Sequence, residues 1–262
     1  MTQKTIVARI KQIQRQLGVP ADGLIGPTTL TAIENNLFSK NILKTIRKNT
    51  SLIVSQLGLK KLVAHEISSK AYYKKYLSHP TWPKGQSGVT IGIGYDLGYN
   101  SITQIRDDWS GKLAEADVER LAVVSGLKGS AAKQVVKSIK DIEVPLEAAE
   151  QVFYGSTLSR YAKQTQKAYP GAEHLHPDAQ AALLSLVYNR GTKMRGSSRK
   201  EMAAIAPLVK QQDYAGIALQ IKGMKRLWEG KNLDGLLKRR DDEAKLIRNA
   251  SRVYDNKELV NV

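Results

Sequence analysis

Residues 88–98, GVTIGIGYDLG, limit the possible folds most, because they form the clearest strand-like pattern in a chain of mostly helical patterns. Apolar residues alternate along the segment with small or polar ones, so one face of a strand would be apolar. The glycines accept a positive φ, and a reversal near Ile93 and Gly94 would bring Asp96 back beside Thr90. We therefore predict a small β-hairpin with a carboxylate on its polar face.

The same segment has a superficial likeness to a dinucleotide-binding loop. That fingerprint, G-x-G-x-x-G, needs two residues in its second gap, whereas Gly94 and Gly98 enclose three. It also belongs to a parallel sheet of alternating strands and helices, and the rest of this chain offers hardly another strand pattern. The sequence therefore argues against a dinucleotide site.

Most of the remaining sequence has the apolar spacing of amphipathic helices. At 262 residues the chain is longer than a typical single domain. We predict a mainly helical α+β fold with two domains, at residues 1–48 and 49–262. The helices predicted in the second domain cover residues 52–67, 114–124, 131–139, 146–158, 179–188, 201–209, 215–221 and 233–247.

The charge of the chain narrows the choice of partners. Lysine and arginine total 41 against 24 acidic residues, a formal net charge of +17. Such a surface attracts polyanions, which include nucleic acid, lipopolysaccharide, anionic membranes and acidic wall polymers. Charge alone does not choose among them.

The sequence gives little indication of a metal site and none of a reactive thiol. The chain has no cysteine, which excludes disulfides, thiolate zinc sites and cysteine nucleophiles. His65 and Glu66 begin an H-E-x-x-H zinc motif, but Ser69 occupies the second histidine position. Two histidines in EHLHPD, residues 173–178, are a weak metal signal, and Pro177 there is better interpreted as the start of a helix. We expect no metal and no cofactor.

One carboxylate falls on the apolar side of a predicted helix. Glu66 lies inside the apolar stripe of residues 52–67, one turn after Leu62. Partial burial would raise the pKa of Glu66, as a general acid near neutral pH requires. The alternative is a glutamate at the edge of the stripe that reaches water or pairs with lysine or arginine. No acid separates Glu66 from Thr90, so Asp96 is the nearest downstream carboxylate, and two carboxylates in unlike surroundings suit glycoside hydrolysis.

Turn-forming residues separate two short helical patterns near the N-terminus. Their order, Q-x-x-L-G, then D-G, then G-P-x-T, resembles the small peptidoglycan-binding domain of cell-wall hydrolases. The resemblance implies a three-helix wall-binding module, although the same residues could simply shape a helical pair. The matching residues are Gln14, Leu17, Gly18, Asp22, Gly23, Gly26, Pro27 and Thr28, of which Asp22, Gly23, Gly26, Pro27 and Thr28 are the candidate wall contacts.

Residues from about 59 to 247 resemble the phage-type lysozymes. A helix with a glutamate precedes T-I-G-I-G, and SLVYNRG and GLLKRRDDEAKLI follow later. Many of these lysozymes place an aspartate between the glutamate and the threonine, where this chain has no acid. The pesticin-like branch places it in the hairpin, which is the order of Glu66, Thr90 and Asp96. The resemblance implies a muramidase that cleaves the MurNAc–GlcNAc bond, with Glu66 as acid, Asp96 as base or charge stabiliser, and Thr90 positioning a water or sugar.

Other residues are candidates for substrate binding. On the hairpin they are Gly92, Gly94 and Tyr95, where a sugar could approach bare backbone closely. Asn189, in YNRG, is a cleft-lining amide by resemblance, or a helix C-cap. By the same resemblance Arg239 reaches Glu66, which would lower the pKa of that carboxyl and oppose the effect of burial.

These observations together predict a phage endolysin. The alternatives are a bacterial effector or bacteriocin muramidase, and an inactive cationic protein that binds wall or nucleic acid. We expect a monomer whose partner is bacterial peptidoglycan, with lipopolysaccharide or an anionic membrane surface as a second partner and no nucleic acid. No export signal is readable at the N-terminus, which fits an enzyme made in the host cytoplasm that reaches the wall through a holin-type pore.

Overall fold

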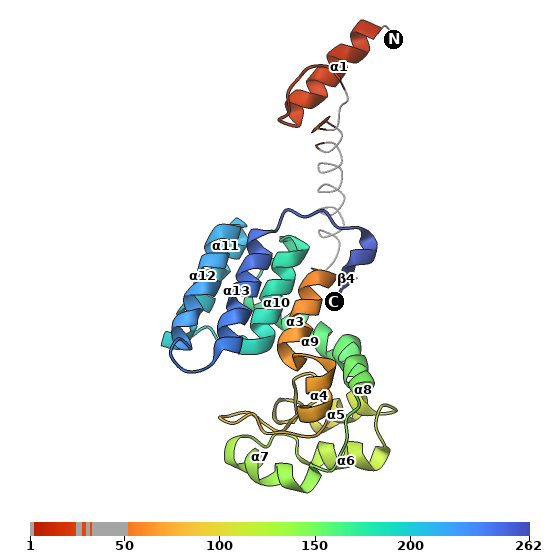
Figure 1. Cartoon of the computed structure of the whole chain (residues 1–262), viewed down its shortest axis with the longest axis vertical. Coiled ribbons are helices and arrows are strands. Elements are labelled where there is room, and N and C mark those ends of the chain that lie inside the picture. Colours follow the sequence, from red (N-terminus) through yellow and green to blue (C-terminus); the bar gives the residue numbers. More distant parts are fainter. Residues whose placement is uncertain (1–2, 25–27, 30–31, 33–51) are drawn as a thin grey trace. The chain divides into compact units, whose positions relative to one another are not determined.

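The chain forms two compact units in the computed structural model (Figure 1). The structure describes residues 3–24, 28–29, 32 and 52–262, so the candidates Gly26 and Pro27 lie outside the described residues. Within the described part of the chain, no helix is long and apolar enough to cross a membrane. The first unit comprises Met1–Thr50 with Ser251–Lys257, and the second comprises Ser51–Ala250 with Glu258–Val262.

The first unit contains α1 (Gln3–Gln16) and a loop that returns along it. The buried amide of Gln14 donates to the Asp22 carboxylate at 2.6 Å and to the Thr29 hydroxyl at 2.9 Å. Its carbonyl oxygen accepts the N–H of Gly23 at 2.8 Å. One polar side chain thus connects the helix to the turn that follows it.

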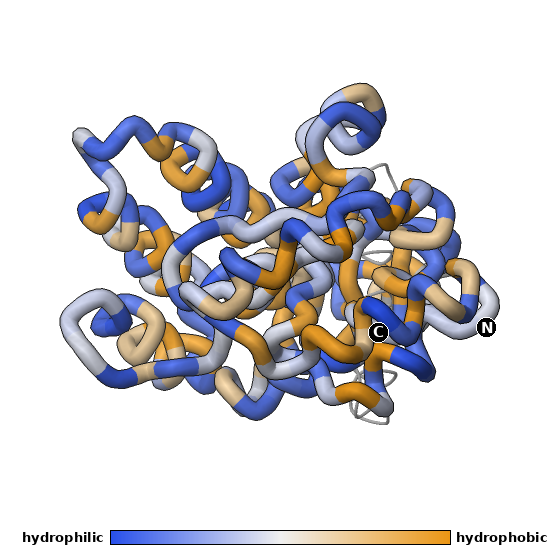
Figure 2. Tube along the Cα trace, turned by 90° about the horizontal axis from the view of Figure 1, so that it is seen from below, coloured by the Kyte–Doolittle hydropathy of each residue, from blue (hydrophilic) through white to orange (hydrophobic). Residues whose placement is uncertain are grey.

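The second unit is mainly helical, as the sequence predicts. Hydrophobic and hydrophilic residues are mixed along its helices (Figure 2). In Figure 1 helices α10 to α13 lie side by side, and α12 packs on both α11 and α13. The helices are α3 (Gln56–Ile67), α4 (Lys70–Tyr76), α5 (Ile102–Trp109), α6 (Glu115–Val123), α7 (Gly129–Val135), α8 (Leu146–Val152), α9 (Leu158–Ala168), α10 (Pro177–Arg190), α11 (Lys200–Gln211), α12 (Tyr214–Gly223) and α13 (Asp234–Arg248).

Helix α10 is the centre of this unit, and α3, α9, α13 and the first strand all pack against it. Every residue from Pro177 to Tyr188 is buried, which is the pattern of a helix surrounded by protein. Pro177 opens the helix, and the ring nitrogen of His176 accepts the N–H of Asp178 at 3.2 Å. The predicted helix start is confirmed, and the side chain of His176 caps the helix.

Two predicted helices change character part of the way along. Residues 131–139 form the end of α7 and a 3₁₀ turn, Val136–Ile139. Residues 146–158 form α8 and a wider π turn, Phe153–Thr157, that leads directly into α9. The predicted helix over residues 52–67 begins only at Gln56, because the residues before it form a strand.

That strand, β1 (Ile53–Ser55), pairs antiparallel with β4 (Leu259–Asn261) near the C-terminus. Ser55 ends the strand and caps α3, since its hydroxyl accepts the N–H of Gly58 at 3.0 Å. Pairing with a distant segment and a side-chain cap therefore override the helical spacing before Gln56.

The predicted hairpin is confirmed. Strands β2 (Thr90–Ile91) and β3 (Tyr95–Asp96) are antiparallel, with Thr90 opposite Asp96. Gly92 and Gly94 make the reversal with φ of +57° and +66°, a region that favours glycine. Its apolar residues Val89, Ile91, Ile93 and Tyr95 are all buried.

Candidate active site

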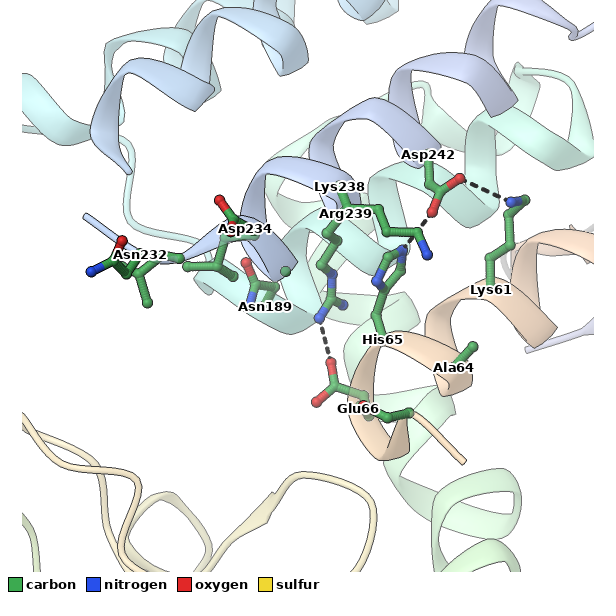
Figure 3. A pocket seen from close by; sticks show the side chains of 14 residues that line it. Lys61, Ala64, His65, Glu66, Asn189, Asn232, Asp234, Lys238, Arg239 and Asp242 are labelled. Atoms are coloured by element: carbon green, nitrogen blue, oxygen red, sulfur yellow. Dashed lines mark hydrogen bonds and ion pairs between the residues drawn. The ribbon is translucent and has the colours of Figure 1, made fainter. Parts of the chain in front are cut away.

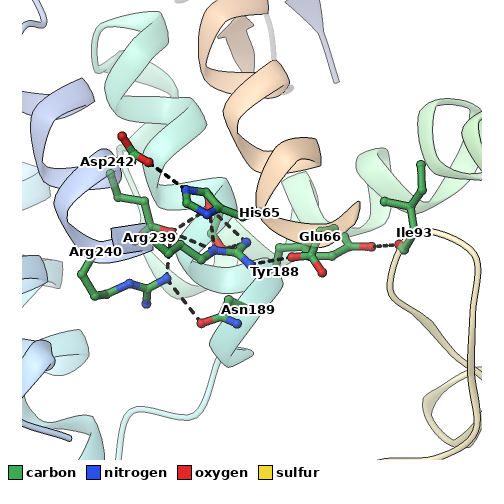
Figure 4. Close-up of polar contacts among 10 residues, drawn as sticks. His65, Glu66, Ile93, Tyr188, Asn189, Arg239, Arg240 and Asp242 are labelled. Carbon is green, nitrogen blue, oxygen red and sulfur yellow. Dashed lines mark hydrogen bonds and ion pairs between the residues drawn. The ribbon is translucent and has the colours of Figure 1, made fainter. Parts of the chain in front are cut away.

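Glu66 lies in the last turn of α3, and its side chain is 18% exposed. Its Oε1 accepts a hydrogen bond from Nη1 of Arg239, on α13, at 2.6 Å (Figure 4). Arg239 is itself almost fully buried. The carboxylate at the edge of the apolar stripe is therefore paired with arginine, the arrangement that the sequence left as an alternative.

Protein groups hold the Arg239 guanidinium on its other sides. Nη2 donates to the Ser185 carbonyl at 3.1 Å, and Nε lies 3.3 Å from Oε1 of Glu243. The Ser185 hydroxyl also donates to Glu243, at 2.7 Å. Burial opposes the charge of Arg239, but the ion pairs with Glu66 and Glu243 hold its pKa above the ordinary value. Arg239 is thus placed to position Glu66, which differs from the expected substrate contact.

Asp96 is held in a different way, by backbone N–H groups. Its Oδ1 accepts the N–H of Gly98 at 2.8 Å, and its Oδ2 accepts the N–H of Gly88 at 3.0 Å. Burial raises the pKa of Asp96 above its ordinary value of 3.8, although both hydrogen bonds and the charge of Lys128 act against the rise. A Cβ at Gly88 would overlap the carboxylate, so only glycine allows this approach.

A single cavity of about 790 Å³ contains Glu66, Thr90 and Asp96 in its lining. A Cβ on Gly94 would lie 3.2 Å from Oε2 of Glu66, so the hairpin backbone comes close to this carboxylate. The hydroxyl of Tyr188 donates to the Ile93 carbonyl and attaches α10 to the hairpin turn (Figure 4). The volume is within the range of ligand sites.

A second cavity, of about 760 Å³, lies on the other side of Glu66, between α3 and the start of α13 (Figure 3). Glu66 and Asn189 line both cavities. Asp242 in this second cavity pairs with Lys61 at 3.0 Å and with His65 at 3.2 Å. Burial lowers the pKa of His65, and the charge of Arg239 adds to the effect. Glu66 therefore stands at the border of two adjoining cavities.

Thr90, Gly94 and Asn189 lie in the cavity lining, as expected of site residues. The alternative of Asn189 as a helix C-cap is wrong, because Gly191 is the C-cap of α10, with a φ of +68°. The Asn189 side-chain oxygen accepts from Arg240 at 3.3 Å.

Two hairpin residues differ from the expectation of substrate contact. Gly92 faces the core, where a Cβ would lie 3.0 Å from Ala149, because the turn breaks the strand alternation that would place it with Gly94. Tyr95 borders the cavity, but its side chain is buried and its hydroxyl donates to Asp108 at 2.7 Å.

Two of the candidate wall contacts of the first unit, Asp22 and Gly23, have structural roles. Asp22 accepts from Gln14 and from the N–H of Leu24, and the Leu24 bond is the main reason that the pKa of Asp22 is lowered. Gly23 has a φ of +82° and packs against α1. Thr28 is exposed.

Sequence spacing missed the aromatic wall of the cavity. Tyr161 on α9 and Tyr188 on α10 have ring centroids 4.4 Å apart. Burial raises the pKa of Tyr161, and the charges of Glu66 and Asp96 raise it further, which places this ring within the field of both carboxylates. Tyr188 adjoins Asn189 in the YNRG segment, but nothing in that segment indicates its bond to the hairpin.

A family model described as Domain of unknown function (DUF8812) matches residues 62–229. The matched region contains Glu66, Thr90 and Asp96 and ends before Arg239. No curated protein matches the chain. Because the matched region covers more than half of the sequence, the chain belongs to the DUF8812 family.

Proposed function

We propose that this protein is a peptidoglycan hydrolase of the lysozyme type, an N-acetylmuramidase that cleaves the MurNAc–GlcNAc bond. The observation that carries the proposal is the single cavity lined by Glu66, Thr90 and Asp96. Glycoside hydrolysis needs two carboxyl groups that face one sugar linkage, one to protonate the leaving oxygen and one to act as base or nucleophile. The two adjoining cavities also offer room for a chain of sugars on both sides of Glu66.

The contacts support a division of roles. Arg239 holds Oε1 of Glu66, while Oε2 faces the hairpin at Gly94. We assign the proton that is transferred to the glycosidic oxygen to Oε2. Asp96 acts as base or charge stabiliser, and the hydroxyl of Thr90 positions a water or sugar.

The first unit acts in this proposal as a wall-binding module, and the whole chain as a phage endolysin. The positive charge of the protein, +17, would attract it to anionic wall polymers. A muramidase effector or bacteriocin would use the same site, so the chemistry of the proposal does not depend on the source.

A lysis assay tests the proposal. Gram-negative cells stripped of their outer membrane should lose turbidity with the wild type and with Glu143→Gln, a matched change at an exposed site. Glu66→Gln should abolish lysis but still sediment with insoluble walls. Full lysis by Glu66→Gln would remove Glu66 from its role. Wall binding without lysis by the wild type would favour the inactive wall-binding alternative.

A further inference from the structure

Residues 67–95 contain no acidic residue, and the first part of this segment, residues 67–76, has no role in the catalytic proposal. The segment contains four lysines and neither acidic residues nor arginine. Three of the lysines lie in α4, which begins four residues after Glu66. A concentration of one charge sign on a short helix is a feature that electrostatic attraction to a partner would explain.

Helix α4 turns nearly all of its side chains outward. Tyr73 is 1% exposed, and its hydroxyl donates to the Val144 carbonyl at 2.9 Å. The other six residues of the helix are exposed. Tyr73 therefore anchors α4 to the rest of the second unit. The remaining surface of α4 is available for contact.

Two tyrosines stand among the lysines on this surface. Tyr72 and Tyr76 are 44% and 50% exposed, and their ring centroids are 4.7 Å apart. The ammonium group of Lys75 lies 5.1 Å from the centre of the Tyr76 ring. Among the described residues, no ion pair joins Lys70, Lys74 or Lys75 to an acidic side chain. We call these five residues, Lys70, Tyr72, Lys74, Lys75 and Tyr76, the α4 patch.

We propose that the α4 patch docks the protein on the surface of an anionic phospholipid bilayer. The lysines would meet the phosphate headgroups, and each lysine near such a surface strengthens binding about fivefold. Tyrosine rings are favoured at the depth of the headgroups, where their apolar part is buried and their hydroxyl stays in water. The patch complements this interface in charge and in polarity.

The residue types favour a broad surface over a single anion or a nucleic acid. Arginine is the usual choice where one phosphate is recognised by two parallel hydrogen bonds, and every basic residue of the α4 patch is lysine. Lysine is a mobile point charge on a flexible stem, which suits headgroups that diffuse sideways. A seven-residue helix is too short to span a bilayer, so the contact would stay at the interface.

Vesicle sedimentation of the full chain tests this inference. The wild type should bind vesicles of equal parts phosphatidylglycerol and phosphatidylcholine far better than vesicles of phosphatidylcholine alone. Lys70→Gln, Lys74→Gln and Lys75→Gln together should lower the partition coefficient on the anionic vesicles by about 100-fold, the product of three fivefold effects. A matched triple, Lys210→Gln, Lys222→Gln and Lys245→Gln, removes the same charge from exposed sites and should lower it much less.

The tyrosines are tested separately. Tyr72→Ser with Tyr76→Ser should weaken the part of the binding that survives high salt, because salt screens charge and not apolar contact. Thermal unfolding followed by circular dichroism checks that each variant stays folded, as expected for changes that retain Tyr73.

Three results would overturn the inference. They are equal losses in the two lysine triples, no preference for anionic vesicles, and α4-dependent binding to duplex DNA in place of vesicles. The inference does not rest on the proposed hydrolysis. Glu66→Gln should bind vesicles as the wild type does, and the α4 triple should still digest purified peptidoglycan fragments, so the two proposals can fail independently.

Discussion

The two walls of the cavity hold their carboxylates by different means. On the helical wall, Glu66 is held by the guanidinium of Arg239, which reaches it from α13. On the hairpin wall, Asp96 is held by the N–H groups of Gly88 and Gly98, which lie close to it in the sequence. The first arrangement balances the charge of the carboxylate with a directly bonded positive charge, whereas the groups that bond Asp96 directly are backbone dipoles.

The difference shows which changes each wall can tolerate. The position of Glu66 depends on a buried network of charges, in which the removal of one member leaves others uncompensated. The position of Asp96 depends on how closely the backbone can approach it, so it is sensitive to a single added carbon atom. The substitution that most disturbs the carboxylate therefore differs between the two walls of the cavity.

We expect the greatest loss of stability and activity from a change on the helical wall of the cavity. Arg239→Met should lower the free energy of unfolding by about 3–5 kcal/mol, because it leaves Glu243 buried without this partner. Lysis activity should also fall, since Glu66 loses the group that positions it. Chemical denaturation and the lysis assay measure both, with Arg248→Met at an exposed site as the control. If Arg239→Met has the stability of the wild type, the ion pairs of Arg239 with Glu66 and Glu243 do not stabilise the helical wall of the cavity.

The hairpin wall should break at Gly88. Gly88→Ala places a Cβ against the Asp96 carboxylate and the backbone of Gly98, and overpacking of this kind costs about 1–3 kcal/mol. Gly155→Ala is the matched control, because a Cβ there meets no atom within 4 Å. Activity should fall in the first variant and not in the second. If Gly88→Ala and Gly155→Ala were equally active, the hairpin would accommodate the added Cβ without moving Asp96 from its active position.

The link between the walls should have a smaller effect. Tyr188→Phe removes the hydrogen bond that joins α10 to the Ile93 carbonyl, at a cost of about 1 kcal/mol. Activity should fall modestly, with the fold retained. Tyr154→Phe, at a tyrosine that is 49% exposed, should change neither quantity. A loss of activity as large as that of Glu66→Gln would give Tyr188 a direct part in the chemistry.

The smallest effect concerns pH and Asp96. The folded protein raises the pKa of Asp96, so it binds this proton more tightly than the unfolded chain does. The resulting stabilisation is complete below pH 3.8 and is lost as the pH rises through the raised pKa. The unfolding free energy of the wild type minus that of Asp96→Asn should therefore decrease with rising pH over this window. Denaturation at a series of pH values measures it, with Asp107→Asn as the control, and an increase would contradict the direction of the shift.

The parts of the fold that depend on local pattern could be predicted from the sequence. Alternation and glycine placement indicated the hairpin and the pairing of Thr90 with Asp96. Helical spacing placed Glu66 on a partly apolar face. The orientation of Gly92 could not be predicted, because it depends on where within the glycine run the chain reverses.

Contacts between segments far apart in the chain could not be predicted from the spacing of residues in the sequence. The pairing of β1 with β4 and the bond from Tyr188 to Ile93 connect residues far apart in the chain. The contact between Arg239 and Glu66 was expected only from resemblance. The patterns also missed α4, α5 and α9, of which α4 is so exposed that it has almost no apolar face to detect.

In the proposed reaction, Glu66 and Asp96 face one glycosidic linkage across the cavity that they share. Mass spectrometry of purified peptidoglycan after digestion shows which bond is cut. We expect new fragments with MurNAc at the reducing end from the wild type and from Glu143→Gln, and none from Glu66→Gln or Asp96→Asn. Fragments that end in reducing GlcNAc, in anhydro-MurNAc or in cleaved peptide would contradict the claim, as would unchanged digestion by either site variant.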